Sequence, residues 1–193
     1  MLHDIDRPFG LYNTIDAERF MVFCILDRAQ EYTQVCRSFD ALDRQGLTTR
    51  KNLKHANKAA IRRILKKSGY RFPNQTAGYL KAFAINPIDL KCATREELVE
   101  SIKGIGLKLA SMFVRNTRGE KVAVLDVHIR NWLRERHGKL PKSYYAQEEL
   151  FLKTAKRMRQ DPRLLDVNVW EARRRKHDHP KKQAPARATA HRA

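Results

Sequence analysis

Residues 103–110 read KGIGLKLA, and this stretch decides how the surrounding chain folds. A glycine inside a helix costs about 1 kcal/mol relative to alanine, so Gly104 and Gly106 predict a tight hairpin between two helices. Small residues in such a turn let the backbone approach a phosphate, and the amides that begin the second helix point toward it. We therefore expect the two glycines and Lys103 to contact a nucleic-acid backbone. Ile105 is expected to fill the seam between the helices.

The charge of the chain also favours a polyanionic partner. Its 193 residues carry a formal net charge of +19, far more than solubility requires. Nucleic acid is the first expectation and an anionic membrane the second. The longest apolar run, FMVFCIL at residues 20–26, is much shorter than the roughly 20 residues that a membrane span needs. The N-terminus has no apolar signal region, so we expect a cytoplasmic, nucleoid-associated protein without a membrane partner.

The cysteines predict neither disulfides nor a metal centre. Cys24, Cys36 and Cys92 are odd in number and widely spaced, which fits neither a disulfide framework nor a zinc or iron-sulfur site. A reducing compartment is consistent with this usage.

Helical periodicity predominates, and no alternating strand pattern is sustained, so the predicted fold class is all-α. We expect a buried helix capped by Asp16 and a helix at Arg95 that begins with a Thr94–Glu97 capping box. Asp126 is expected to cap the helix that follows it. The remaining helices are expected at 48–69, about 107–115, 142–160 and 164–175.

Two segments are strongly basic. The expected single helix at 48–69 has one face without acids, which is either a solvated surface or a stripe that binds a phosphate backbone. Its bases are Arg50, Lys51, Lys54, Lys58, Arg62, Arg63, Lys66 and Lys67. Residues 177–193 are rich in proline, alanine and bases with almost nothing to bury, so we expect a disordered tail.

Lys108, directly after the hairpin, has three interpretations: a phosphate contact, a surface charge or a nucleophile. The motifs IKGIGLKLA and VLDVHI together resemble the helix-hairpin-helix DNA glycosylase superfamily. That resemblance implies that Lys108 is the nucleophile, that Asp126 assists it and that His128 contacts a DNA phosphate. Asp126 could alternatively be a plain helix cap.

The implied chemistry suits these residue types. A primary amine that attacks the sugar C1′ displaces the base and leaves a Schiff base, which permits β-elimination of the 3′ phosphate. The amine must be neutral to attack. We therefore expect burial, or a cationic neighbour such as Lys103, to lower the pKa of Lys108.

Further stretches resemble the type 2 8-oxoguanine DNA glycosylases over about residues 15–172. They are FCIL, GYRFPNQTAGYL, SMFVRNTRG and LLDVNVW, in that order. The absence of a cysteine cluster separates the chain from endonuclease III and the adenine glycosylases. One departure concerns the C-terminus, since type 2 enzymes end in a Thr-Gly turn and a terminal lysine, whereas this chain continues as EARRRKHDHPKK.

The resemblance implies roles for three more residues. Trp170 is expected to stack on the flipped base, with a core tryptophan as the alternative. Arg28 or Gln30 is expected to fill the gap that the base leaves, with a simple polar helix end as the alternative. The implied architecture has one lobe at 20–113, carrying the hairpin, and a second lobe built from 1–19 and 114–176, with DNA in the cleft between them.

The implied activity is that of a bifunctional DNA glycosylase and AP lyase. It would act as a monomer on double-stranded DNA with an oxidised purine, most simply 8-oxoguanine. No redox cofactor or catalytic metal is expected, but a monovalent cation at the hairpin carbonyls is compatible. The alternatives are another damaged base and a noncatalytic helix-hairpin-helix DNA-binding protein.

Overall fold

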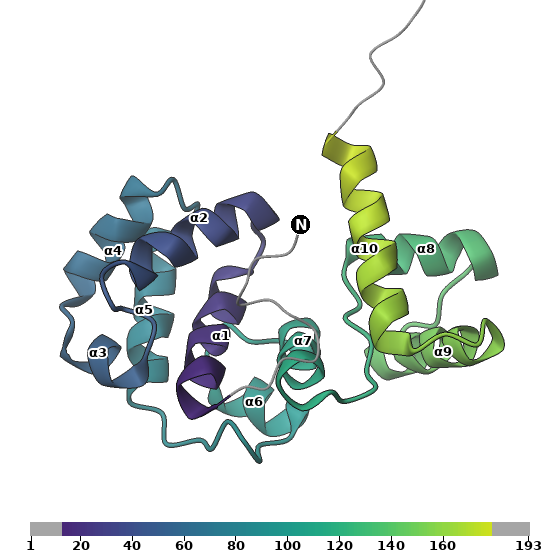
Figure 1. Ribbon diagram of the computed structural model, residues 1–193, viewed down its shortest axis with the longest axis horizontal. Coiled ribbons are helices and arrows are strands. Elements are labelled where there is room, and N and C mark those ends of the chain that lie inside the picture. The colour runs from purple at the N-terminus through teal and green to yellow at the C-terminus, as the bar shows by residue number, and fades with distance from the viewer. Residues whose placement is uncertain (1–12, 179–193) are drawn as a thin grey trace, which may run out of the picture.

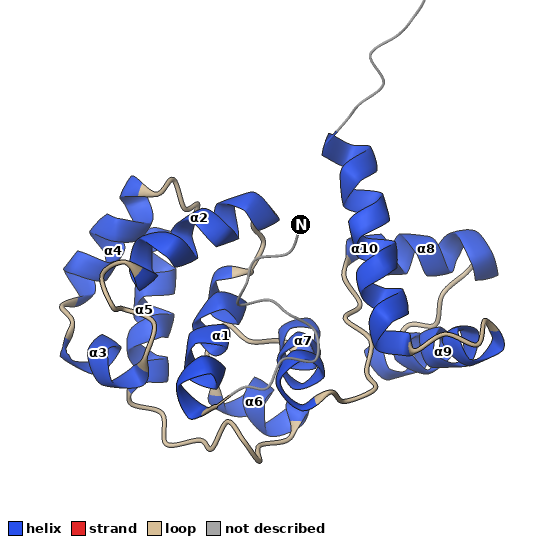
Figure 2. Ribbon diagram, in the orientation of Figure 1, coloured by secondary structure: helices blue, strands red, loops and turns tan. Residues whose placement is uncertain are grey.

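The computed structural model describes residues 13–178, and residues 1–12 and 179–193 lie outside the described part. Within it the chain forms helices and no strand, which confirms the predicted all-α class (Figures 1 and 2). The helices are α1 (Thr14–Leu26), α2 (Tyr32–Asp43), α3 (Arg50–His55), α4 (Lys58–Lys67), α5 (Pro73–Ala84), α6 (Arg95–Ser101), α7 (Leu107–Arg118), α8 (Val127–His137), α9 (Tyr144–Arg157) and α10 (Pro162–Asp178).

Two hydrophobic clusters organise these helices. The first joins α1–α7, which we call the first lobe, and the second joins α8–α10, which we call the second lobe. Figure 1 shows the two groups side by side, linked by the chain that leaves α7. Ala17 packs in the first cluster, and the boundary expected between residues 19 and 20 falls inside α1. The exact domain limits stay a prediction.

Helix α1 lies at the centre of the first lobe, and its residues 20–26 are all fully buried. Its cap differs from our prediction, because the side chain of Asn13 accepts a hydrogen bond from the backbone amide of Asp16 at 2.9 Å. The helix also ends at Leu26 rather than near residue 30. Asp27 is therefore the residue that follows α1 and does not lie inside the helix.

The prediction of a single helix at 48–69 is wrong. The chain breaks at Ala56, which is extended (φ −68°, ψ 141°), and the Asn57 side chain caps α4 by accepting from the amide of Ala59 at 2.7 Å. The break is stabilised from outside, since the ammonium group of Lys81 on α5 donates to the carbonyls of Leu53, Lys54 and Ala56. These carbonyls at the end of α3 accept hydrogen bonds from the ammonium group, so they do not require backbone amides from a further helical turn.

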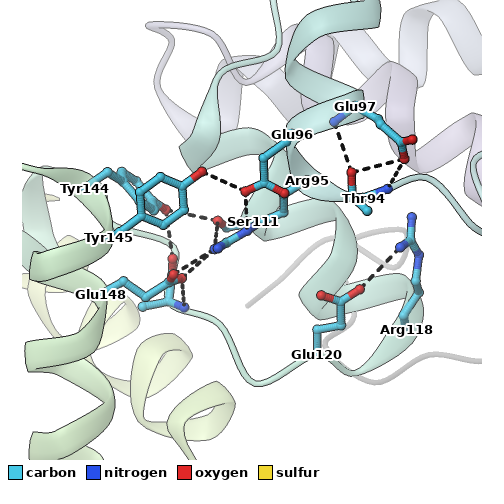
Figure 3. Close-up of polar contacts among 11 residues, drawn as sticks. Thr94, Arg95, Glu96, Glu97, Ser111, Arg118, Glu120, Tyr144, Tyr145 and Glu148 are labelled. Atoms are coloured by element: carbon cyan, nitrogen blue, oxygen red, sulfur yellow. Dashed lines mark hydrogen bonds and ion pairs between the residues drawn. The ribbon is translucent and has the colours of Figure 1, made fainter.

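The hairpin between α6 and α7 forms as predicted. The Thr94–Glu97 capping box begins α6 (Figure 3). Gly104 has φ +93°, and a Cβ there would lie 2.7 Å from the ring of Tyr79, so both conformation and space require glycine. Ile105 is only 6% exposed and belongs to the first cluster. The second helix, α7, is longer than expected and ends at Gly119 in the left-handed conformation.

The second lobe contains the other predicted helices with shifted ends. Asp126 caps α8, as predicted, by accepting from the amide of Ile129 at 2.8 Å. Helix α9 is shorter than the expected 142–160, and α10 runs to Asp178, slightly into the segment expected to be disordered. The rest of that segment lies outside the described residues. No helix in residues 13–178 is long and apolar enough to cross a membrane.

Candidate active site

A cleft of about 900 Å³ separates the two lobes. The end of α1 and the beginnings of α2 and α7 form one side, and α8 and α10 form the other. Five of the residues singled out from the sequence line this cleft: Gln30, Lys108, Asp126, His128 and Trp170. They come from both lobes, so the fold brings together residues that are far apart in the chain.

Lys108 is held by a carboxylate that sequence reasoning did not identify. Its Nζ donates to Oδ2 of Asp27 at 2.6 Å, and the side chains of Lys108 and Asp27 are 33% and 14% exposed. Burial acts to lower the pKa of Lys108, but the charge and hydrogen bond of Asp27, helped by the charge of Asp126, outweigh it and raise the pKa. Our expectation of a lowered pKa is therefore wrong, and Lys108 is a charged ammonium group in this arrangement.

The missed residue, Asp27, has a weak sequence signal. It is the first charged side chain after the apolar run at 20–26, at the end of the buried helix α1. The turn that follows is unusual, since Ala29 has φ +52° without being glycine. A carboxylate at such a place is directed by the turn into the cleft.

The segment that carries Asp126 to the cleft is anchored by the second lobe. The amide of Val124 donates to Oδ2 of Asp166 on α10 at 2.6 Å, and the amide of Ala123 donates to Oε1 of Glu148 on α9 at 3.0 Å. Ala123 belongs to the second hydrophobic cluster and Val124 to the first, as an extended segment with alternating side chains requires. The position of Asp126 thus depends on both lobes.

Two ion pairs join the lobes, and one of them lies in the lining of the cleft. Arg95 on α6 donates to both carboxylate oxygens of Glu148, at 2.7 and 2.9 Å (Figure 3). Arg115 on α7 lies 3.1 Å from Oδ1 of Asp166, and both side chains are buried. Burial raises the pKa of Asp166 to about 6, although Arg115 and the Val124 amide oppose this shift. Both pairs fix the relative position of α7 and the segment before α8.

Trp170 lies at the edge of the cleft and is partly exposed. Its ring meets that of Tyr32 on α2 edge to face, with the centroids 4.9 Å apart. The guanidinium group of Arg174 lies 4.9 Å from the Trp170 centroid and 5.1 Å from that of Tyr32. The tryptophan is therefore available to the cleft, and its proposed stacking role stays a prediction.

The two candidate wedge residues lie in different places. Arg28 donates to Oε1 of Gln75 at 2.7 Å and stacks over Tyr79, and it is not part of the cleft lining. Gln30 lines the cleft, and its Nε2 is buried without a hydrogen-bond partner. Which of the two fills the gap in the duplex stays a prediction.

The hairpin presents the features of an anion site. Gly106 is the N-cap of α7 with no side-chain capping bond, and the space beside its Cα is open. The first amides of α7 are thus available to a phosphate. Lys103 is exposed beside them. These contacts with DNA also stay predictions.

Helices α3 and α4, which carry the basic face, lie on the side of the first lobe remote from α8 and α10 (Figure 1). Arg50 is not part of it, since this side chain donates to the Ile88 carbonyl and stacks over Phe83. The other predicted members of the face are exposed. Among the described side chains, those of residues 13–174, no group of three or more histidine, cysteine or acidic residues could hold a metal ion.

Comparison with known proteins identifies relatives. A sequence model described as 8-oxoguanine DNA glycosylase, of the Ogg helix-hairpin-helix type, matches residues 12–160. The 8-oxoguanine DNA glycosylase/AP lyase of Saccharolobus solfataricus is 31% identical over 88% of this chain and 89% of that protein. The enzyme of the same name from Thermoplasma volcanium is 30% identical over 78% of this chain and 76% of its own length.

Solved structures agree with the fold. The 8-oxoguanine DNA glycosylase of Thermotoga maritima has a TM-score of 0.69 and 27% identity, covering 83% of this chain and 80% of that one. The Methanocaldococcus jannaschii 8-oxoguanine glycosylase/lyase in complex with DNA containing 8-oxoguanine has a TM-score of 0.69 and 25% identity, covering 83% and 82% of the two chains.

Proposed function

The chain belongs to the 8-oxoguanine DNA glycosylase family, and on that premise we propose that it removes 8-oxoguanine from double-stranded DNA and then cuts the strand at the abasic site. The observation that carries this proposal is the convergence of Lys108, Asp126 and Trp170 on one cleft between the lobes. An amine, a carboxylate and a flat aromatic surface are the three elements that such chemistry needs.

In the proposed reaction, Lys108 first loses the proton that makes it an ammonium group, and its Nζ then forms a bond to C1′ of the nucleotide as the bond from C1′ to the base nitrogen breaks. The electron pair of that bond leaves with the base, which is then protonated. The attached nitrogen loses a further proton, and its electron pair expels O4′ from C1′, so the sugar ring opens, O4′ takes up a proton and a Schiff base remains. The Schiff base acidifies the C2′ proton, and loss of that proton expels the 3′ phosphate by β-elimination. Asp126 would stabilise the positive charge that develops on the sugar.

Binding of DNA is proposed to use the hairpin. The turn at Gly104, the open backbone at Gly106 and the first amides of α7, which donate hydrogen bonds, would bind a phosphate. Lys103 and His128 would add positive charge or hydrogen bonds. Trp170 would stack on the extruded base, and Arg28 or Gln30 would occupy its place in the duplex. We also propose that the protein acts as a monomer in the cytoplasm. The carbonyls of the hairpin would bind a monovalent cation.

Borohydride trapping tests the proposal. The wild-type protein should form a covalent adduct with a duplex that contains 8-oxoguanine, and Lys108→Gln should form none. Lys156→Gln is the matched control, because it removes an exposed lysine on α9, away from the cleft lining, and should still trap. A Lys108→Gln variant that traps and cleaves would show that another residue is the nucleophile.

The same assay separates the alternatives. Trapping on duplexes with thymine glycol or uracil, but not 8-oxoguanine, would assign the chemistry to another damaged base. Binding that weakens steeply with salt, together with no trapping on any duplex, would indicate a noncatalytic DNA-binding protein.

A further inference from the structure

Three residues that line the cleft each have a buried side-chain nitrogen without a hydrogen-bond partner. These atoms are Nε2 of Gln30, Nε of Arg130 and Nε of Arg174. Among the side chains of residues 13–174, a single buried acceptor lacks a partner, Oε1 of Gln147, and it lies outside this cleft. A buried donor without a partner is costly, so the cleft is suited to a ligand that supplies acceptors.

Arg174 lies beside the expected base platform. It stands four residues after Trp170 on α10, so the two side chains share one face of the helix. Its guanidinium group is within about 5 Å of the Trp170 and Tyr32 rings, which come from different lobes. A base that stacks on Trp170 would therefore lie close to this cation.

We propose that Arg174 is a specificity-determining residue that recognises the carbonyl oxygens of the oxidised purine. This inference rests on the proposed function and names the part of the base that is read. A guanidinium group carries donors only and no acceptor. It can donate to the carbonyl oxygens at positions 6 and 8 of 8-oxoguanine, but it repels the amino group that 8-oxoadenine carries at position 6.

The competing explanation is that Arg174 only packs the lobes together through its two aromatic neighbours. The two explanations differ in which step they affect. Recognition of the base matters for base excision and is irrelevant once the base is gone. Packing of the lobes affects the cleft as a whole, so its loss would also slow strand cleavage at an abasic site.

The test compares Arg174→Gln with Arg173→Gln in single-turnover reactions on two duplexes. One duplex contains 8-oxoguanine and the other a preformed abasic site. Arg173 is the matched control because it is the adjacent arginine on the same helix and pairs with Glu135, away from the cleft lining. Arg174→Gln should slow 8-oxoguanine excision about tenfold to a hundredfold, as expected for a lost hydrogen bond from a charged group.

Cleavage of the abasic duplex by Arg174→Gln should change by no more than about twofold, and Arg173→Gln should match the wild type on both duplexes. The preference for 8-oxoguanine over 8-oxoadenine should also narrow in Arg174→Gln. An equal loss of rate by Arg174→Gln on both duplexes, or no loss of rate on either, would overturn the inference while leaving the proposed function intact. A wild-type protein that processes neither duplex would instead refute the proposed function, and the inference with it.

Discussion

Removing the carboxylate of Asp27 should accelerate the attack of Lys108 at neutral pH. In the structure Asp27 keeps Lys108 protonated through a 2.6 Å hydrogen-bonded ion pair, and an ammonium group has no electron pair with which to attack. Asp27→Asn keeps the shape and one acceptor oxygen but removes the charge. Burial, which acts to lower the pKa of Lys108, would then be opposed mainly by Asp126.

The size of the effect follows from the geometry. Two unit charges 4 Å apart interact with about 4 kcal/mol at the effective dielectric constant of about 20 typical near a protein surface. Lys108 is one-third exposed, so solvent screening reduces this value considerably. We take about 1.4 kcal/mol, which corresponds to about tenfold more neutral amine and about tenfold faster Schiff-base formation at neutral pH.

The assay is borohydride trapping on a duplex with a preformed abasic site, followed from about pH 6 to pH 10. The advantage of Asp27→Asn should be greatest at low pH and should vanish once Lys108 has lost its proton in the wild type. Asp43→Asn is the matched control, because Asp43 pairs with Arg19 in the same lobe and away from the cleft. A slower Asp27→Asn at neutral pH would refute this reasoning and would make Asp27 a required proton acceptor.

Three further predictions concern stability. Gly104→Ala should lower the free energy of unfolding by about 1–3 kcal/mol in urea, because its φ of +93° is strained for alanine and its Cβ meets a ring; Gly106→Ala, in open space, should change it little. Lys81→Met should lower the free energy of unfolding by about 2 kcal/mol, because it leaves three carbonyls at the end of α3 without their cation. Lys67→Met, on the exposed face of α4, should lower it by almost nothing, and thermal melts compare the two variants. Asp166→Asn should be destabilising, but its deficit should shrink as the pH rises from about 4 to about 6. Burial raises the pKa of Asp166, so the folded wild type binds this proton more tightly than the unfolded chain, and that stabilisation is lost as the pH rises through about 6; melting temperatures that diverge above pH 6 would contradict this.

The parts of the fold that the sequence predicted correctly are those that depend on neighbouring residues. The Thr94–Glu97 capping box, the cap at Asp126 and the turn at Gly104 are each formed within a few residues of chain. Their chemistry is complete locally, so the sequence pattern contains all the information that they need.

The errors have distant causes. The helix expected at 48–69 breaks at Ala56 because Lys81, on another helix, binds the carbonyls there. Asn57 was the one local signal for that break, since asparagine is a strong helix cap. The pKa of Lys108 was predicted in the wrong direction because its partner, Asp27, is far away in sequence. Nothing in the pattern around either residue indicates that they meet.

The candidate site was predictable as a set of residues but not as an arrangement. Lys108, Asp126 and Trp170 came from a family resemblance, and the structure places all three on one cleft. The buried Arg115–Asp166 pair could not be predicted, since its members belong to different lobes and no periodicity connects them.

The division of the cleft between two lobes has a consequence for adaptation. Lys108 belongs to the first lobe and Asp126 to the second. The distance between them therefore depends on the Arg95–Glu148 and Arg115–Asp166 pairs, which join the lobes. Substitutions at this interface can change the turnover of the enzyme without touching DNA. The cost of dehydrating an ion pair falls as the temperature rises, whereas the gain from apolar burial levels off. Natural variation in these pairs therefore offers a route by which such a protein can be tuned to a new growth temperature.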